Sequence, residues 1–343
     1  MMPGKILRFL EDQGTIAISG TRDANLIPHV HPVSGWEVEP DKGTIRCSIN
    51  QAYLDNLISS LQDNGQFSLT VEQIGSHETY QFKGTYVGST QPTSADLAAH
   101  QRMTNRFALA VNQLFGVPED NSRAYIPRPN LIVRFAVREI FLQTPGPGAG
   151  HRVFPPAELS TGAEVAGHGA SAPLTLDSLS RSEKQGADSQ GSCVQAATQT
   201  QMTDEGKLPD EIKSVMENGL PAIVVTCSAD GIPNTTLISH VHYVDKTHAA
   251  LSFQFFNKTI RNVRENSYAC VALNDVMANA KWILDVQYDH SETEGPIFDE
   301  MDMQIEAIAS ASGMAGIFKL RAADIYLVRS FRKLDVTSES SIK

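Results

Sequence analysis

The chain has 343 residues, of which 41% are hydrophobic and 20% are charged, and its formal net charge at pH 7 is -11. This length predicts about two domains, and the acidic balance argues against a general binder of nucleic acid or anionic membranes, because both need a basic surface. No run approaches the roughly 18 apolar residues of a membrane helix.

Helix and strand patterns alternate through the first 147 residues. Apolar residues on one face predict a helix over residues 5–13 that ends at Gly14. Further apolar positions at helical spacing predict a helix that carries Leu54 to Leu61 and a long helix over 94–115. Short β-rich runs predict strands over residues 15–19, 28–33, 44–49, 66–73, 79–87 and 131–142. We therefore predict a first domain over residues 1–147.

The composition changes between residues 148 and 206. Gly, Ala, Ser, Thr and Gln dominate this segment, and aromatic residues nearly vanish after Phe154. Such a segment cannot bury enough apolar area to offset the entropy that is lost on ordering. We predict a flexible linker over residues 148–206, a second domain over 207–335 and a disordered tail over 336–343.

The second domain repeats the first at one constant offset. A helix opens at Pro209-Asp210 and ends at Gly219, and a strand follows over residues 222–227. The same order of helix, glycine, strand, turn and Ile-Pro pair indicates two copies of one domain. The aligned positions include Gly14 with Gly219, Ala17 with Ala222, Ile18 with Ile223, and Ile27-Pro28 with Ile232-Pro233.

Residues 251–263 change from a strand pattern to a helix pattern at Asn257, which is a good helix N-cap residue. Free backbone N–H groups and the helix dipole make such a turn suitable for a phosphate. Lys258, Thr259 and Arg261 crowd the same turn. The alternative is an ordinary solvated helix start with surface charges.

A helix followed by short antiparallel strands, with a helix after the third strand, predicts a small barrel with helical decoration. The second copy resembles the FMN-binding split barrel of the pyridoxamine 5'-phosphate oxidase-like superfamily through the runs Ala229-Asp230-Gly231-Ile232-Pro233-Asn234, Val244-Asp245 and Asn257-Lys258-Thr259. The first copy resembles it through Gly20-Thr21-Arg22-Asp23-Ala24 and Pro28-His29-Val30. The resemblance implies a mainly β, α+β fold: two tandem split β-barrels joined by the linker, with FMN as cofactor.

The resemblance also implies roles for one strand and one turn of the second copy. The strand after the Asp-Gly-x-Pro turn would lie along the flavin ring or the ribityl chain, which points to Asn234, Thr235, Thr236, Leu237 and Ser239. The next β-rich run and its turn would hold the ribityl phosphate, which points to Ser252, Gln254, Asn257, Lys258 and Thr259, with Arg261 as a weaker candidate. The site usually lies at a dimer interface in this family, so we expect a homodimer.

The first copy departs from this pattern at the phosphate turn. The residues that align with Asn257-Lys258-Thr259 are Asn50-Gln51-Ala52-Tyr53, which include no cation. A charge-assisted contact contributes roughly 1.5–3 kcal/mol, so the first copy should bind FMN weakly. We predict that residues 207–335 form the flavin-competent domain and that residues 1–147 form a degenerate copy, which packs against it or walls the site.

Two His-x-His pairs occur, at His29-Val30-His31 and at His240-Val241-His242. Alternate residues of a strand share a face, so each pair is a possible metal chelate. The ungapped alignment does not superpose the two pairs, and no carboxylate or Cys stands at ligand spacing beside them, so we predict no metal. His240 and His242 follow the proposed flavin strand and are therefore the candidates for proton transfer, for orienting a substrate or for contacting haem.

Two further patterns bear on structure and location. Acidic residues gather between Asp285 and Asp302, where we expect a solvated loop and a helix N-terminus. The cysteines are scattered without metal spacing, and the two in apolar strand-like runs, Cys227 and Cys270, should be buried and inert. A reducing cytoplasm is the simplest location.

These patterns together predict an FMN-dependent oxidoreductase that acts on a small molecule, with the flavin carrying the electrons and the protein binding and orienting both partners. Three other interpretations of the same barrel stay open. They are a non-enzymatic flavin- or haem-binding protein, a relative that uses a deazaflavin, and a relative that uses haem.

Overall fold

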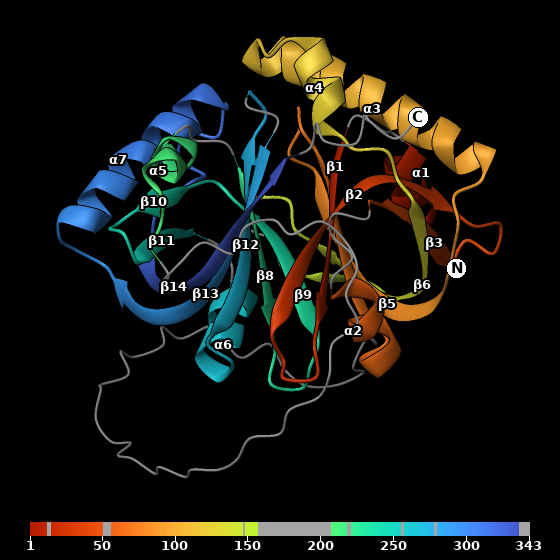
Figure 1. Ribbon diagram of the computed structural model, residues 1–343, viewed down its shortest axis with the longest axis horizontal. Coiled ribbons are helices and arrows are strands. Elements are labelled where there is room, and N and C mark those ends of the chain that lie inside the picture. The colour runs from red at the N-terminus through yellow and green to blue at the C-terminus, as the bar shows by residue number, and fades with distance from the viewer. Residues whose placement is uncertain are drawn as a thin grey trace, which may run out of the picture. The chain divides into compact units, whose positions relative to one another are not determined.

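The computed structural model describes residues 1–11, 15–50, 56–146, 148–156, 207–217, 221–254, 257–277 and 280–335. Within this part of the chain, each half forms one seven-stranded sheet with flanking helices (Figure 1). The prediction of two tandem barrels of mixed α and β structure is confirmed. Most of the predicted linker, and the predicted tail from residue 336, lie outside the described residues.

The first barrel is closed. Its strand order is β3-β2-β1-β4-β5-β6-β7, all neighbours are antiparallel, and β3 also pairs with β6, which joins β1 to β6 into a ring. The elements are α1 (Gly4–Glu11), β1 (Thr15–Arg22), β2 (Pro28–Val38), β3 (Thr44–Ile49), α2 (Leu57–Asn64), β4 (Gln66–Gln73), β5 (Thr79–Thr90), α3 (Ser94–Phe115), α4 (Glu119–Tyr125), β6 (Leu131–Leu142) and β7 (Arg152–Phe154).

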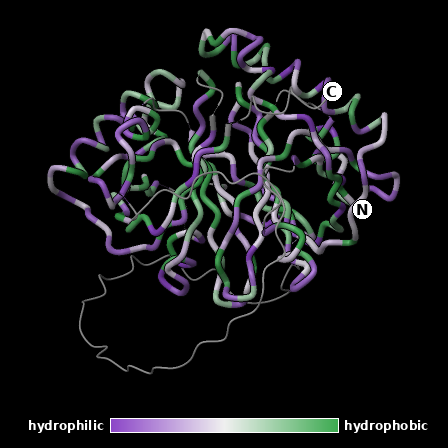
Figure 2. Tube along the Cα trace, viewed as in Figure 1, coloured by the Kyte–Doolittle hydropathy of each residue, from purple (hydrophilic) through white to green (hydrophobic). Residues whose placement is uncertain are grey.

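The second sheet is curled, with the antiparallel strand order β10-β11-β14-β13-β12-β8-β9. Its core gathers Val224, Val271, Trp282 and Leu284, and Figure 2 shows hydrophobic residues along the strands of both sheets. The elements are α5 (Asp210–Glu217), β8 (Ala222–Cys227), β9 (Pro233–Ile238), β10 (Val241–Tyr243), β11 (His248–Phe253), α6 (Asn257–Glu265), β12 (Tyr268–Asp275), β13 (Ala280–Glu292), α7 (Pro296–Ala311) and β14 (Ala322–Asp335).

Two departures from the predicted elements concern the acidic run and the start of the predicted linker. The acidic run does not begin in a loop, because Asp285 and Asp289 lie on β13, and only the residues beyond Glu292 reach the turn and α7. Alternate apolar residues of β13 are buried in the core, which leaves its acidic residues on the opposite face. The second departure is that β7 pairs with β6 inside the range that was predicted as linker.

Strand alternation gives the first barrel a polar face toward the second barrel. On β4, Phe67, Leu69 and Val71 point into the core of the first barrel, while Ser68 and Thr70 point the other way. Ser68 and Thr70 hydrogen-bond to Thr235 of the second barrel. The two barrels therefore pack on each other through strands.

An apolar cluster joins the two barrels beside these polar contacts. It combines residues of β1 and β2 with residues of β8, β12, β13 and β14, namely Ile18, Val30, Ile223, Val225, Cys270, Ala272, Ile283 and Leu334. The first barrel thus covers one face of the second barrel of the same chain. A homodimer stays a prediction, and it would need another surface.

Gly20 on β1 lies where the two barrels touch. A Cβ atom there would come within 2.4 Å of Thr235 Oγ1 and 2.7 Å of Val225 Cγ1. We expect Gly20→Ala to destabilise the chain by about 1–2 kcal/mol, because the neighbouring side chains must shift in a packed interface. Denaturant unfolding measures the change. Gly75→Ala is the control, since a Cβ at Gly75 meets no atom within 4 Å; equal stability of the two variants would contradict this packing.

Three cysteines of the described chain, Cys47, Cys227 and Cys270, are buried free thiols. Burial raises the pKa of Cys227 to about 11 and raises the pKa of the other two further. Thiols with raised pKa values are poor nucleophiles. Among the described helices, none combines the length and the apolar character that crossing a membrane requires.

Candidate functional site

The start of α6 and the start of β9 bring four predicted residues together, and we call Asn234, Thr236, Lys258 and Thr259 the phosphate corner. The side-chain amide of Asn234 donates to Thr236 Oγ1 and to Thr259 Oγ1, each at 3.4 Å. Lys258 precedes Thr259 in the first turn of α6, and its side chain is exposed. The corner therefore combines a cation, hydroxyl groups and an amide at a helix N-terminus, which suits an anion.

The local sequence explains why α6 presents Lys258 to solvent. Val263 is buried in the core of the second barrel, and Ile260 packs against the same core. The side-chain amide of Asn262 donates to Thr226 Oγ1 at 3.0 Å, which ties the helix to β8. Lys258 and Arg261 therefore lie on the outer side of the helix, and both are exposed. Asn257 is the first residue of α6, as the capping pattern predicted within one residue.

Other predicted residues of β9 face the first barrel. Thr235 is fully buried, and its Oγ1 lies 2.6 Å from Ser68 Oγ. Its carbonyl accepts hydrogen bonds from Thr70 Oγ1 at 2.7 Å and from Gln81 Nε2 at 2.6 Å. Leu237 packs against the apolar cluster between the barrels. The predicted set thus divides between two sides of one strand, and Thr235 already has partners for both of its polar groups.

A lysine of the first barrel reaches the phosphate corner. Lys83 lies on β5, is 6% exposed, and its Nζ donates to Asn234 Oδ1 at 3.3 Å. Among the described residues, no carboxylate lies within 4.0 Å of this ammonium group. Burial and, to a lesser extent, the positive charge of Lys258 together lower the pKa of Lys83 to about 7.

Sequence reasoning missed Lys83 because its local pattern is that of an ordinary outward-facing residue. Tyr80 and Phe82 of β5 belong to the core of the first barrel, so Gln81 and Lys83 fall on the opposite face. That face is covered by the second barrel rather than by water. The available signal was weak: two long polar side chains at alternate positions of the same strand as buried aromatic residues.

The repeat places a matching pair of residues on the other side of the barrel interface. The constant offset aligns Asn234 with His29. Ser68 of β4 and Cys270 of β12 occupy matching positions in the two copies. Ser68 pairs with Lys83 and Cys270 pairs with Asp285, so Lys83 and Asp285 also match. The charge of Asp285 acts on His29, whose pKa is nevertheless lowered because burial is the larger effect. The matching corner therefore carries a carboxylate where the phosphate corner carries an ammonium group.

The two predicted catalytic histidines lie close to each other and near α7. Their ring centroids are 6.0 Å apart, and His242 Nε2 lies 4.0 Å from Glu300 Oε2. His240 is 2% exposed, and its backbone N–H donates to Ser252 Oγ at 3.3 Å. Burial and the charge of His242 lower the pKa of His240 to about 4. His240 is therefore neutral at pH 7.

Several buried polar atoms in this region have no hydrogen-bond partner among the described residues. They include both ring nitrogens of His240, Nδ1 of His242, Nε2 of Gln254 and Oε1 of Gln304. Buried polar groups are normally paired, so such a group of orphaned atoms indicates a place for water or for a ligand. Gln254 and Ser252 were predicted contacts, and both are buried. Ser239 is partly exposed in the bend after β9.

The histidines and the phosphate corner mark opposite ends of one segment. Asn234 and His240 are six residues apart, which is on the order of 20 Å along an extended strand. In the part of the chain that the structure describes, no three His, Cys, Asp or Glu side chains are arranged to hold a metal ion.

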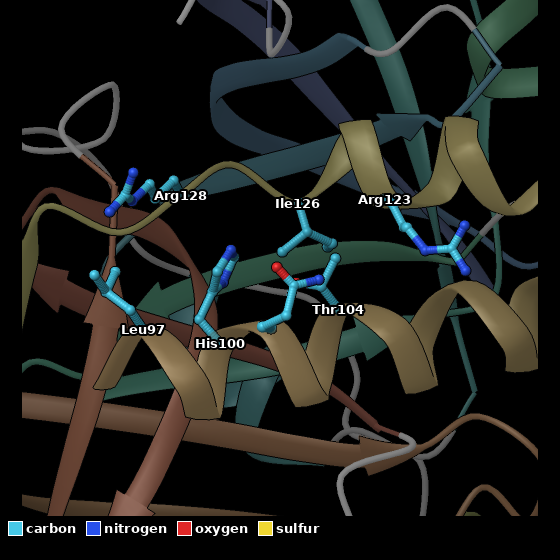
Figure 3. Close-up of a pocket in the computed structure, with 7 residues that line it drawn as sticks. Leu97, His100, Thr104, Arg123, Ile126 and Arg128 are labelled. Carbon is cyan, nitrogen blue, oxygen red and sulfur yellow. The ribbon is translucent and has the colours of Figure 1, made fainter. Parts of the chain in front are cut away.

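A separate cavity of about 380 Å³ lies in the first barrel, between α3 and the segment that follows α4 (Figure 3). The ring of His100 projects from α3 into it, and Nδ1 of His100 donates to the carbonyl of Ser34 at 2.8 Å. Arg123 on the opposite wall already pairs with Glu119 and Asp120. No predicted site residue lines this cavity, so it is distinct from the phosphate corner.

Comparison with known proteins gives one family match, and it falls on the second barrel. Residues 208–329 match the family described as pyridoxamine 5'-phosphate oxidase. No curated protein matches the chain.

Three solved structures that match part of this chain have descriptions that name different cofactors. An FMN-binding protein from Syntrophomonas wolfei subsp. wolfei is 14% identical over 36% of this chain and 82% of its own, with a TM-score of 0.31. An F420 reductase is 12% identical over 37% of this chain and 99% of its own, with a TM-score of 0.28. HutZ, a haem storage protein from Vibrio cholerae, is 15% identical over 36% of this chain and 90% of its own, with a TM-score of 0.26. At such TM-scores these matches do not decide the function.

Proposed function

Because residues 208–329 form a domain of the pyridoxamine 5'-phosphate oxidase-like superfamily, we propose that this chain is an FMN-dependent oxidoreductase acting on a small molecule, with the flavin held by the second barrel. The observation that carries the proposal is the phosphate corner. Asn234 is far in sequence from the adjacent residues Lys258 and Thr259, yet it meets them at the start of a helix with donors and a cation suited to a phosphate.

The residues present fit the chemistry of FMN at the phosphate corner and at Gln254. At the phosphate corner, the hydrogen bonds of Asn234 to the two threonines are long, at 3.4 Å, so its amide can turn to a better acceptor. Lys258 is exposed and forms no ion pair among the described residues. Gln254 carries a buried amide nitrogen without a partner, which suits a ribityl hydroxyl or a ring carbonyl.

Bound FMN would supply the electron transfer, and the side chains of this chain would bind, orient and handle protons. Lys258 and Thr259 would hold the phosphate, while Gln254 would donate to an oxygen of the cofactor. His240 is neutral at pH 7, so it offers one N–H donor and one lone pair rather than an imidazolium. Its role in proton transfer would be to hold or accept a proton.

Haem binding is the second candidate function. A buried neutral imidazole whose two nitrogens lack partners is the kind of side chain that can ligate haem iron, and His240 is such a group. The deazaflavin alternative shares the phosphate corner with FMN. We also propose a cytoplasmic location, which accords with the free buried thiols, and we retain a homodimer as a proposal that needs a surface other than the barrel interface.

The absorbance spectrum of the purified chain, with mass spectrometry of whatever is bound, tests the proposal. We expect a flavin spectrum, or uptake of added FMN, with one FMN per chain, because the corner that matches the phosphate corner carries Asp285. A Soret band without flavin would favour the haem candidate. A chain that takes up neither FMN, deazaflavin nor haem would contradict both candidates.

A further inference from the structure

We propose that the first barrel supplies a second cation to the phosphate corner, so that one phosphate is held between Lys83 of the first barrel and Lys258 of the second. The inference rests on the proposed function, since FMN is the phosphate monoester that we expect there. It assigns the first copy a part in ligand binding in addition to packing.

The geometry brings the two barrels together at Asn234. Lys83 Nζ donates to Asn234 Oδ1 at 3.3 Å, and Asn234 Nδ2 donates to Thr259 Oγ1 at 3.4 Å on α6. One amide thus connects the lysine of β5 to the first turn of the helix that carries Lys258. A phosphate at the start of α6 would meet donors from both barrels.

Charge gives the second argument. Lys83 is 6% exposed without a carboxylate within 4.0 Å among the described residues, and Lys258 adds a like charge nearby. A buried ammonium group is costly unless it is paired. A phosphate monoester carries a charge of about −1.5 to −2 near pH 7, and it would pair with both lysines at once.

The repeat gives the third argument. The position that matches Lys83 is Asp285, and the position that matches Asn234 is His29. If these positions served only to pack the two barrels together, similar residues at both matching corners would be sufficient. The opposite charges instead distinguish the two corners, and a phosphate suits the corner of Lys83 and Lys258 better than the corner where Asp285 stands beside Arg332.

A pH dependence follows from the surroundings of Lys83. The groups that act on it are Lys258 on α6, Glu139 on β6, Asp230 in the turn after β8, and Cys227 on β8. Without ligand, the pKa of Lys83 is about 7; a bound phosphate dianion would raise it, so binding above pH 7 takes up a proton. FMN affinity should therefore fall as pH rises from 7 to 9, by at most about ten-fold per pH unit.

Lys83→Met tests the proposal, because methionine keeps much of the packing and removes the charge. We measure dissociation constants by flavin fluorescence for FMN and for riboflavin, which lacks the phosphate, and the thermal shift caused by inorganic phosphate. The control is Lys281→Met: Lys281 is also a buried lysine at the interface, where its Nζ donates to the carbonyl of Tyr125 at 3.4 Å.

The expected result is an FMN affinity about ten-fold lower in Lys83→Met, with riboflavin affinity unchanged, the phosphate-induced shift reduced and the pH slope above 7 lost. Lys281→Met should bind like the parent. Parent-like FMN affinity in Lys83→Met, or equal losses for FMN and riboflavin, would overturn the inference and leave the proposed function intact. A parent that binds phosphate through Lys83 but not FMN would overturn the function alone, and a parent that binds neither would overturn both.

Discussion

Lys258→Ala is expected to lower the affinity for FMN about ten- to a hundred-fold, which corresponds to a loss of roughly 1.5–3 kcal/mol. The substitution removes the cation in the first turn of α6, where backbone N–H groups and the helix dipole already favour a phosphate. The fold should persist, because the side chain is exposed and lies outside the core of the second barrel. Titration of FMN, followed by flavin fluorescence, measures the change.

Two control variants make this measurement specific. Lys213→Ala removes an exposed lysine of α5, which pairs with Glu217, so it changes the net charge equally without touching the corner. Gln51→Ala changes the aligned turn of the first copy, which lies outside the described residues, and it should leave FMN binding unaltered. Parent-like affinity in Lys258→Ala, or a loss in Gln51→Ala instead, would show that the phosphate lies elsewhere.

When the pH falls from 7 to 5, the free energy of unfolding of the parent chain should decrease by about 2 kcal/mol more than that of the His240→Gln variant. Burial lowers the pKa of His240 from 6.5 to about 4 in the folded state. Between these two values the unfolded chain binds a proton that the folded chain does not bind, so stability is present above pH 6.5 and is lost as the pH falls toward 4. Glutamine has a similar length and does not titrate, so the variant should not lose this part of its stability when the pH falls.

Urea unfolding at pH 7 and pH 5 gives the difference between parent and variant. His290→Gln is the control, because His290 is exposed and its pKa is raised by its hydrogen bond to Asp289. Replacement of His290 should change the dependence of the free energy of unfolding on pH only slightly, and the change should have the opposite sign to that of His240→Gln. If His240→Gln loses as much stability on acidification as the parent does, His240 is not the buried neutral histidine that these contacts describe.

Local patterns in the sequence were sufficient for α1, α3, α5, most strands of the first barrel and part of the site, whereas α4 and several strands of the second barrel were not predicted. Residues 44–49, 66–73, 94–115, 131–142 and 222–227 form the predicted elements with the predicted bounds. The capping pattern at Asn257 places the start of α6, and the repeat identifies two barrels. These features are local, since they depend on periodicity and on a few residues at a turn.

The pairing of the barrels was the part that no local pattern specified. On β5, Lys83 alternates with core residues just as a solvated residue would, and only the packing of a second barrel makes it buried. On β13, Asp285 belongs to a run of acidic residues that resembles a loop, although alternate apolar residues hold the strand in the core. Both misreadings have one cause: a strand face that reads as solvent-exposed is covered by a distant part of the chain.

The opposite charges of Lys83 and Asp285 show that matching positions of the two barrels can differ, which is impossible in a symmetric dimer. In a homodimer with a two-fold axis, each residue occurs on both sides of the interface, so every substitution changes two sites together. Here the matching positions are separate codons of one chain, and each can change alone. One corner can keep a lysine for an anionic ligand while the other acquires a carboxylate for packing. The duplication thus allows the two halves to specialise, at the cost of one binding site per pair of barrels.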